Sequence, residues 1–197
     1  MYKNAIFLSI LCFLLSPSSG WSHPHVFIDT SVKIVFDEKG LAGARIQWVF
    51  DEMFSSMIIM DFDRNKNRRF ESDEVAEVKA GAFSNLKEFG YFTHIKIDGK
   101  PFKVSFVKDF SAKIDHERMI YTFFVPCHVC ATTAFKQVSL SVYDPEFYSD
   151  IVLVKDSLLL ENRESYEASC RIRKSPDTAY YFGQIVPEEI LLRFKRK

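Results

Sequence analysis

A twelve-residue acidic stretch carries the most specific chemical pattern in this sequence. Oxygen-bearing side chains stand at positions 1, 3, 5, 9 and 12 of the run from Asp63 to Glu74. Ca²⁺ takes six to eight oxygen ligands, and a loop with this spacing supplies them from alternate side chains, one main-chain carbonyl and a final bidentate Glu. The spacing predicts an EF-hand-like calcium loop with these ligand residues: Asp63, Asn65, Asn67, Arg69 through its carbonyl, Glu71 and Glu74.

The same stretch departs from the calcium pattern at its sixth position. A glycine is expected there because the chain turns through a positive φ, and this sequence has Arg68. Four basic residues also weaken cation binding: Arg64, Lys66, Arg68 and Arg69. A loop that starts at Asp61 is a second register, but it places Ser72 at position 12. The alternative to a calcium site is a helix-loop-helix corner held by hydrogen bonds alone.

A pair of histidines near the beginning of the chain forms a second candidate site. His23 and His25 stand at i and i+2, so on an extended segment both side chains point to one side, as does Asp29. Neutral imidazole is the commonest ligand for Zn²⁺, Cu²⁺ and Ni²⁺. The alternative is two surface histidines at a frayed terminus.

Cysteines supply a third set of reactive side chains. Cys127 and Cys130 form a CxxC around His128, and Cys170 stands alone. A disulfide between Cys170 and one CxxC cysteine, a short-loop disulfide within the CxxC, and half of a soft-metal site are the alternatives.

The first 22 residues predict a signal peptide. A basic start is followed by a short apolar run from Ala5 to Leu15 and by small residues, with cleavage after Ser22 or after Gly20. The mature chain is then expected to be secreted and not embedded in the membrane. The whole chain has 26 basic and 26 acidic residues, so nothing in its charge favours nucleic acid.

Alternating apolar residues predict the strands that must position these groups. Residues 25–36 and 44–50 form a first hairpin, Asp98-Gly99 marks a second, and Asp115–Arg118 a further turn. More strands are expected at 121–125, 135–143, 151–154 and 165–171. Pro187 is interpreted as the start of a short helix over 188–195.

Helical periodicity appears between the first hairpin and the second. Asp51 is expected to cap a helix from Glu52 to about Phe62, and apolar residues repeat at helical spacing from Val75 to Phe89. Residues 23–197 therefore predict one α+β domain, an antiparallel sheet or sandwich in which residues 51–90 form an EF-hand-like insertion.

Three segments resemble a bacterial family, the domain of unknown function numbered 1007. They are the opening run from His23 to Asp29, the acidic stretch 61–74, and the Tyr-Asp-Pro segment from Val142 to Tyr148. The resemblance implies a periplasmic metal-handling protein, because family members accompany nickel/cobalt-type permeases and some are implicated in zinc acquisition. It implies an inner-membrane metal permease as partner and names no catalytic residue.

Two functions follow from these patterns. The first is a divalent-metal-binding accessory protein for zinc, nickel or cobalt, with His23 and His25 as ligands and a third from Asp29, His128 or Asp144. The second is a β-sandwich interaction domain with a structural calcium loop and no transport role. An enzyme is not expected, since the sequence contains no zinc-protease helix motif and no phosphate-binding loop.

Overall fold

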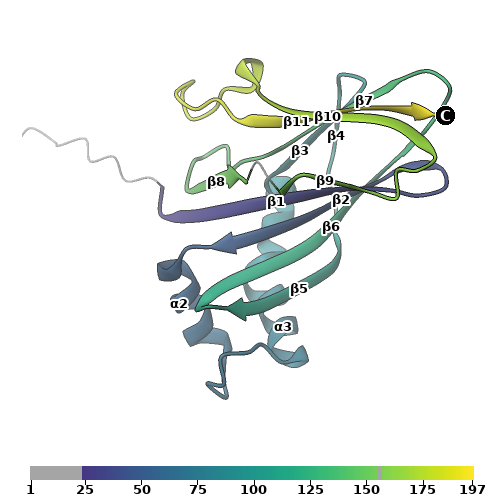
Figure 1. Ribbon diagram of the computed structural model, residues 1–197. Coiled ribbons are helices and arrows are strands. Elements are labelled where there is room, and N and C mark those ends of the chain that lie inside the picture. Colours follow the sequence, from purple (N-terminus) through teal and green to yellow (C-terminus); the bar gives the residue numbers. More distant parts are fainter. Residues whose placement is uncertain (1–23, 155–156) are drawn as a thin grey trace, which may run out of the picture.

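A six-stranded sheet forms one layer of the molecule (Figure 1). The structure is a computed structural model that describes residues 24–154 and 157–197, so His23 and the predicted signal peptide lie outside it. The strands follow the order β5-β6-β2-β1-β8, and β9 also pairs with β1. They are β1 (Val26–Phe36), β2 (Gly40–Phe50), β5 (Lys108–Asp115), β6 (Arg118–Cys130), β8 (Ser149–Leu153) and β9 (Leu159–Glu161).

A five-stranded sheet in the order β10-β11-β7-β3-β4 forms the second layer. Its strands are β3 (Thr93–Ile97), β4 (Lys100–Phe102), β7 (Lys136–Val142), β10 (Tyr166–Lys174) and β11 (Glu188–Arg196). Two sheets with few helices confirm a β-rich α+β fold. The expectation of a wholly antiparallel sheet is wrong, because β8 and β9 both pair with β1 in parallel.

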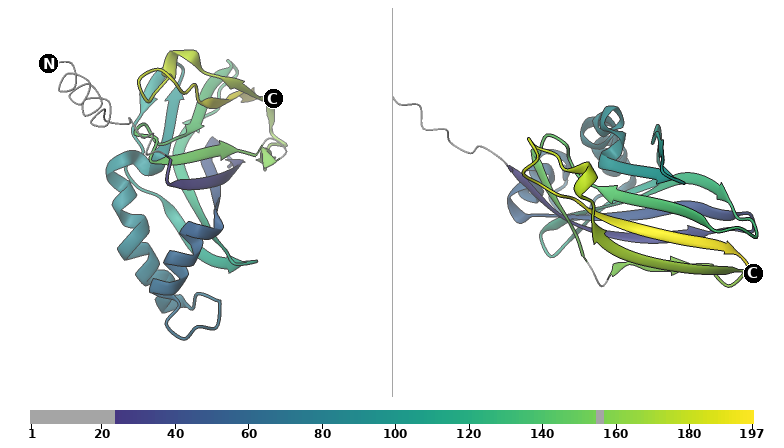
Figure 2. Two further views of the ribbon diagram at one scale, coloured as in Figure 1. Left: turned by 90° about the vertical axis from the view of Figure 1, so that its left-hand side faces the viewer. Right: turned by 90° about the horizontal axis from the view of Figure 1, so that it is seen from above.

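Aromatic side chains join the two layers into one core. At one end Phe36 of β1 packs on Tyr166 and Phe194 of the second sheet, with ring centroids 5.0 and 5.3 Å apart. At the other end Trp48 of β2 packs on Phe83 of the helical segment. The first sheet therefore buries one face under the second sheet at one end and under helices at the other (Figure 2). Each such side chain contributes roughly 1.5–3 kcal/mol by burial.

The first hairpin matches its predicted pattern. Val32 pairs with Ile46 and Thr30 with Trp48, and these side chains are buried, while Lys33 and Arg45 point to the opposite face. This alternation is what fixes the register, since a slip by one residue would expose the whole apolar set.

The helical segment lies between β2 and β3. Helix α2 (Glu52–Phe62) begins as predicted, with the Asp51 carboxylate accepting from the Phe54 N–H at 2.8 Å. After a loop come α3 (Ser72–Val78), a π-helical turn (Lys79–Phe83) and a 3-10 segment (Ser84–Phe92). The Ser55 hydroxyl accepts from the Met119 N–H at 2.9 Å, which ties α2 to β6. Among the described residues, no helix is long and apolar enough to cross a membrane.

The predicted helix over 188–195 is wrong, because this segment is strand β11. Leu, Glu, Arg and Lys are good helix formers, which favoured the helical interpretation. In the fold, β11 lies between β10 and β7 and buries four consecutive residues, Glu189 to Leu192. Pairing on both edges and burial outweigh the local preference.

Candidate functional site

The beginning of β1 is anchored on the segment that follows Tyr143. The carbonyl of Tyr148 accepts hydrogen bonds from the backbone N–H groups of His25 at 2.9 Å and Val26 at 3.4 Å. The rings of His25 and Tyr148 lie 4.9 Å apart, and β8 then continues beside β1 in parallel. Two motifs that are far apart in the sequence thus meet at one end of the first sheet.

Asp144 shapes the turn that presents Tyr148. Its side chain is buried, with Oδ1 accepting from the Glu146 N–H and Oδ2 from the Ser149 N–H, both at 3.0 Å. Its carbonyl accepts from the Phe147 N–H at 2.9 Å. With both carboxylate oxygens engaged by backbone donors, Asp144 acts as a positioning residue for this turn.

Asp29 shares the exposed side of β1 with His25, as the period of two predicts. Its carboxylate is engaged by Arg118, whose Nη2 lies 3.1 Å from Oδ2. Arg118 also donates from Nε to the Phe50 carbonyl at 2.7 Å, so it connects the three neighbouring strands β6, β2 and β1. Asp29 therefore has a cationic partner in Arg118.

His128 lies at the opposite end of the sheet from His25. Its neighbour Val129 pairs with Leu41, which in turn pairs with Phe36 at the far end of β1. Since β1 is 11 residues long, roughly 35 Å separates His128 from His25. The expectation that His128 joins the same metal site is wrong. Among residues 24–154 and 157–197, no group of three or more His, Cys, Asp or Glu side chains is placed to hold a metal ion.

Sequence reasoning missed a stack of rings behind the Tyr-Asp-Pro segment. His94 stacks on Tyr143 at 3.9 Å, and Tyr143 stacks on Tyr180 at 4.6 Å. A ring nitrogen of His94, Nε2, lies 3.1 Å from the Tyr143 carbonyl. Burial lowers the pKa of His94, which keeps the imidazole neutral near pH 7. The stack joins one residue of β3 to two residues outside the strands, so no periodic signal in the sequence predicted it.

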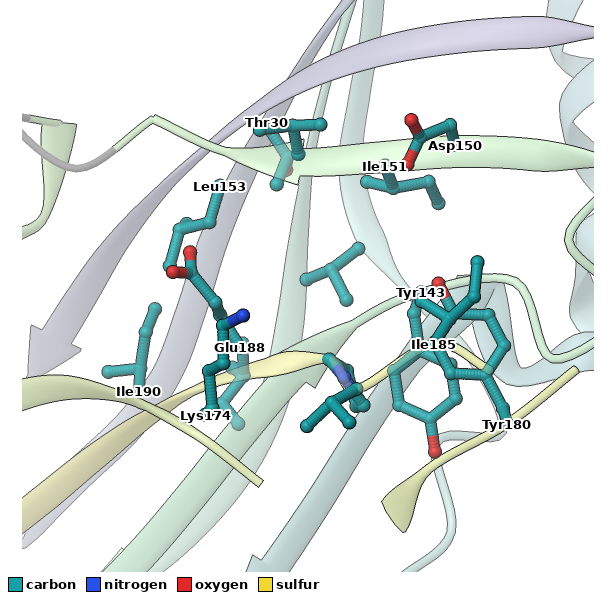
Figure 3. A pocket seen from close by; sticks show the side chains of 15 residues that line it. Thr30, Tyr143, Asp150, Ile151, Leu153, Lys174, Tyr180, Ile185, Glu188 and Ile190 are labelled. Carbon is teal, nitrogen blue, oxygen red and sulfur yellow. The ribbon is translucent and has the colours of Figure 1, made fainter. Parts of the chain in front are cut away.

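A small cavity of mixed polar and apolar lining adjoins the stack. Its volume is about 200 Å³, and Figure 3 shows Tyr143 and Tyr180 at one end with Lys174 and Glu188 at the other. Asp150 of β8 also faces it, and burial raises the pKa of this carboxyl. Burial, with the nearby charge of Asp150, raises the pKa of Tyr180 to about 12.

The acidic loop between α2 and α3 is organised around two buried carboxylates. Asp63 and Glu74 are 5% and 2% exposed. Asp63 accepts from the N–H groups of Asn67 at 3.2 Å and Arg68 at 2.9 Å. Glu74 accepts from those of Arg64 and Glu71, both at 2.9 Å. The first and last predicted ligands thus hold the loop closed through its own backbone.

The intermediate ligand positions form successive turns. Asn65 accepts from the Asn67 N–H at 2.9 Å, and Asn67 accepts from the Arg69 N–H at 2.8 Å. The Asn67 side-chain amide also donates to Glu71 at 2.8 Å. Asn65 and Asn67 thus form two overlapping turns, each closed by a side-chain oxygen on the backbone N–H two residues further on.

Arg68 adopts the conformation expected of the missing glycine, with φ at +60°. Its guanidinium pairs with Glu117 of the β5–β6 turn, away from the loop. Arg64 is similarly drawn outward, to Asp73 and to Glu77 at 3.2 Å. Two of the four basic side chains therefore have acidic partners outside the predicted ligand set.

Cys127, Cys130 and Cys170 are free thiols in the structure. The CxxC lies within β6, where Cys127 is buried and Cys130 is exposed, so their side chains face opposite ways. Cys170 lies on β10 in the other sheet. Burial raises the pKa of Cys127 to about 12 and that of Cys170 to about 11.

Sequence comparison connects the chain to proteins without an assigned activity. The family described as "Protein of unknown function (DUF1007)" matches residues 8–179. A Spirochaeta aurantia protein named "Uncharacterized 15.5 kDa protein in trpE 3'region" is 34% identical over 131 residues, which are 66% of this chain and 93% of that protein. An "Uncharacterized protein" of Haemophilus influenzae is 25% identical over 130 residues, 64% of this chain and 61% of that relative.

Proposed function

This chain belongs to the DUF1007 family, and on that premise we propose that it is a periplasmic accessory protein that binds a divalent transition metal for an inner-membrane metal permease. The observation that carries the proposal is the junction of His25 with Tyr148. It joins the two motifs on which the family resemblance rests most strongly, at an exposed end of the sheet. The transport role and the permease partner come from the resemblance.

Histidines 23 and 25 are the ligands we propose. The His25 side chain is exposed, and backbone hydrogen bonds fix its strand, so the imidazole starts from a defined position. Preorganisation of this kind lowers the entropic cost of binding. With Asp29 and Asp144 engaged elsewhere, two protein ligands leave coordination positions open. Open positions suit a protein that passes its metal cargo to a partner.

Competition titration tests metal binding directly. Zn²⁺, Ni²⁺ and Co²⁺ are titrated into the purified protein in the presence of a chromogenic chelator. The proposal predicts one equivalent bound for at least one metal, with affinity rising between pH 5.5 and pH 7.5 because the ligand imidazoles must be deprotonated. A protein that fails to compete for all three metals contradicts it. Radioactive metal uptake at limiting metal, compared between cells with and without this protein, tests the transport role.

We also propose that residues 63–74 form an EF-hand-like corner with a weak calcium site. The supporting observations are the buried Asp63 and Glu74, the alternating Asn turns and the positive φ of Arg68. The five ligand side chains already accept backbone or side-chain hydrogen bonds, which keeps the corner formed when no ion is bound. Calcium then adds stability to a shape that exists without it, and this role fits the alternative function of a β-sandwich interaction domain.

A further inference from the structure

A second cavity, the outer cavity, opens on the outer face of the second sheet. Its volume is about 310 Å³, at the small end of the range for ligand pockets. Residues of β3, β4 and β7, which are neighbours in the sheet (Figure 1), line it together with the end of the 3-10 segment Ser84–Phe92. The lining combines charged, hydroxyl and aromatic side chains, and these groups define the chemistry of a ligand.

Four side chains on two paired strands form the centre of the outer cavity. In the register of β3 and β7, His94 pairs with Ser141 and Lys96 pairs with Ser139. On each strand the residue between them is buried in the core, so the four side chains point outward. Directly opposed residues have Cβ atoms about 4.5–5.5 Å apart, so adjacent members of this group can bind one small ligand group together.

The Ser141 hydroxyl is an unpaired group at the floor of this cavity. The residue is only 7% exposed, and its hydroxyl has no hydrogen-bond partner within the described part of the chain. Its oxygen nevertheless reaches the cavity, because the unpaired side-chain atoms that are sealed from solvent among the described residues are Trp48 Nε1 and the Tyr121 hydroxyl. Ser139, two residues away on the same face, is half-buried and also has no partner there. Two neighbouring free hydroxyls are donors for an acceptor group.

The charge of the lining favours an anion. Three lysines line the outer cavity, and none has an ion-pair partner among residues 24–154 and 157–197: Lys87, Lys96 and Lys103. Two acidic residues also line it. The buried Glu189 carboxylate is neutralised by Arg173 at 2.6 Å, which leaves the exposed Glu88 against the three lysines. A concave site with this excess of one charge concentrates ligands of the opposite charge.

Aromatic side chains flank the charged centre. Phe89 of the 3-10 segment is half exposed, and Phe102 of β4 and Tyr143 after β7 line the same space. Burial against such rings contributes about 25 cal/mol for each Å² of apolar ligand surface removed from water. A ligand that uses the whole cavity therefore has an apolar body as well as an anionic group.

We propose that the outer cavity binds a small organic anion whose oxyanion, a carboxylate or a phosphate, is held by Lys96 and by the hydroxyls of Ser139 and Ser141. The two hydroxyls donate to the oxyanion, and the ammonium of Lys96 balances its charge. The apolar body of the ligand packs on Phe89 and Phe102. This inference does not depend on the metal binding proposed above.

Isothermal titration calorimetry with benzoate and phenyl phosphate tests the site, and benzamide is the neutral isostere of benzoate. We expect at least one anion to bind at a single site, and benzamide to bind at least about tenfold more weakly than that anion. The anion that binds more tightly identifies the head group. Added sodium chloride should weaken binding, because salt screens the lysines. The proposal is overturned if neither anion shows saturable binding up to about 10 mM, or if benzamide binds as tightly as the better anion.

Two substitutions and a matched control test the location. Lys96→Gln removes the central ammonium, so the affinity for the anion should fall about tenfold. Ser141→Ala removes the floor hydroxyl and should lower affinity about fivefold. Lys100→Gln makes the same charge change on β4 outside the cavity and should leave affinity unchanged. If circular dichroism shows that Ser141→Ala is unfolded, Ser139→Ala tests the adjacent hydroxyl. Wild-type affinity in both the lysine and the serine variant overturns the proposal.

Discussion

His25 and Tyr148 are joined twice, through a backbone hydrogen bond of 2.9 Å and through rings 4.9 Å apart. The contact forms where β1 begins and where the turn before β8 ends. It therefore depends on the turn at Asp144 on one side and on the β1–β8 register on the other. The proposed metal ligand His25 and the Tyr-Asp-Pro segment meet at this point.

Removal of the Asp144 carboxylate should destabilise the protein. Asp144→Ala leaves the Glu146 and Ser149 N–H groups without their acceptor, so the free energy of unfolding should fall by about 2–4 kcal/mol. Asp144→Asn retains one acceptor oxygen and should lose less. Urea denaturation followed by circular dichroism measures both. The positioning role is contradicted if Asp144→Ala and Asp144→Asn lower the free energy of unfolding equally. It is also contradicted if Asp144→Ala lowers it by less than about 0.5 kcal/mol.

Stability should fall on acidification through the ordinary pKa of histidine. The pKa of His94 is lowered from 6.5, mainly by burial, so the folded state binds the proton less readily than the unfolded state. The stabilising contribution is complete above about pH 6.5 and is lost as pH falls through the lower, folded-state pKa. The free energy of unfolding at pH 7.5 and 5.5 should differ more in wild type than in His94→Phe.

The control for this pH effect is His116→Asn. His116 is almost fully exposed in a turn with positive φ, a conformation that Asn tolerates. This variant should keep the wild-type pH dependence. A His94→Phe variant that also keeps it would show that another group is responsible.

Calcium should raise the melting temperature through Glu74. For a weak site that adds about 1 kcal/mol, the rise is roughly 2–4 °C in a protein of this size. Glu74→Gln should lose the difference between melts in calcium and in chelator. Glu77→Gln makes the same charge change on the exposed side of α3 and should retain it. A wild type without any calcium-dependent rise indicates a corner held by hydrogen bonds alone.

The three cysteines that follow the predicted signal peptide should differ sharply in reactivity. Cys130 is exposed, whereas burial raises the pKa of Cys127 and Cys170 to about 12 and 11. At pH 8, Ellman's reagent should react rapidly with one thiol, and Cys130→Ser should remove that rapid phase. The buried thiols should react when the protein is denatured. A disulfide is present if the native protein shows no rapid phase and the denatured protein yields fewer reactive thiols than it has cysteines.

Local sequence patterns were sufficient for the elements whose faces alternate cleanly. The β1–β2 hairpin, the Asp51 cap and the start of α2 follow from single-residue preferences and short periods. The same local patterns fail for β11, where burial on both faces removes the alternation and the residues favour helix. They also miss the parallel pairing of β8 with β1, because this contact joins segments that are distant in the chain.

The candidate sites also divide into those that local sequence spacing predicts and those that depend on the fold. The oxygen spacing of the Asp63–Glu74 loop was visible in the sequence because all its groups are local. The separation of His25 from His128 was not, since it depends on the order and register of three strands. The unpaired Trp48 Nε1 and Tyr121 hydroxyl could be found only in the packed structure, because in the sequence each residue looks like an ordinary core residue.

The most direct test of the central claim compares two double-histidine variants in metal titration. His23→Ala/His25→Ala removes the proposed ligands, and His116→Ala/His128→Ala removes two other exposed histidines at a distance. The account predicts that the first variant loses transition-metal affinity by at least about tenfold, equivalent to 1.4 kcal/mol, while the second binds as the wild type does. Unchanged affinity in the His23→Ala/His25→Ala protein would contradict it.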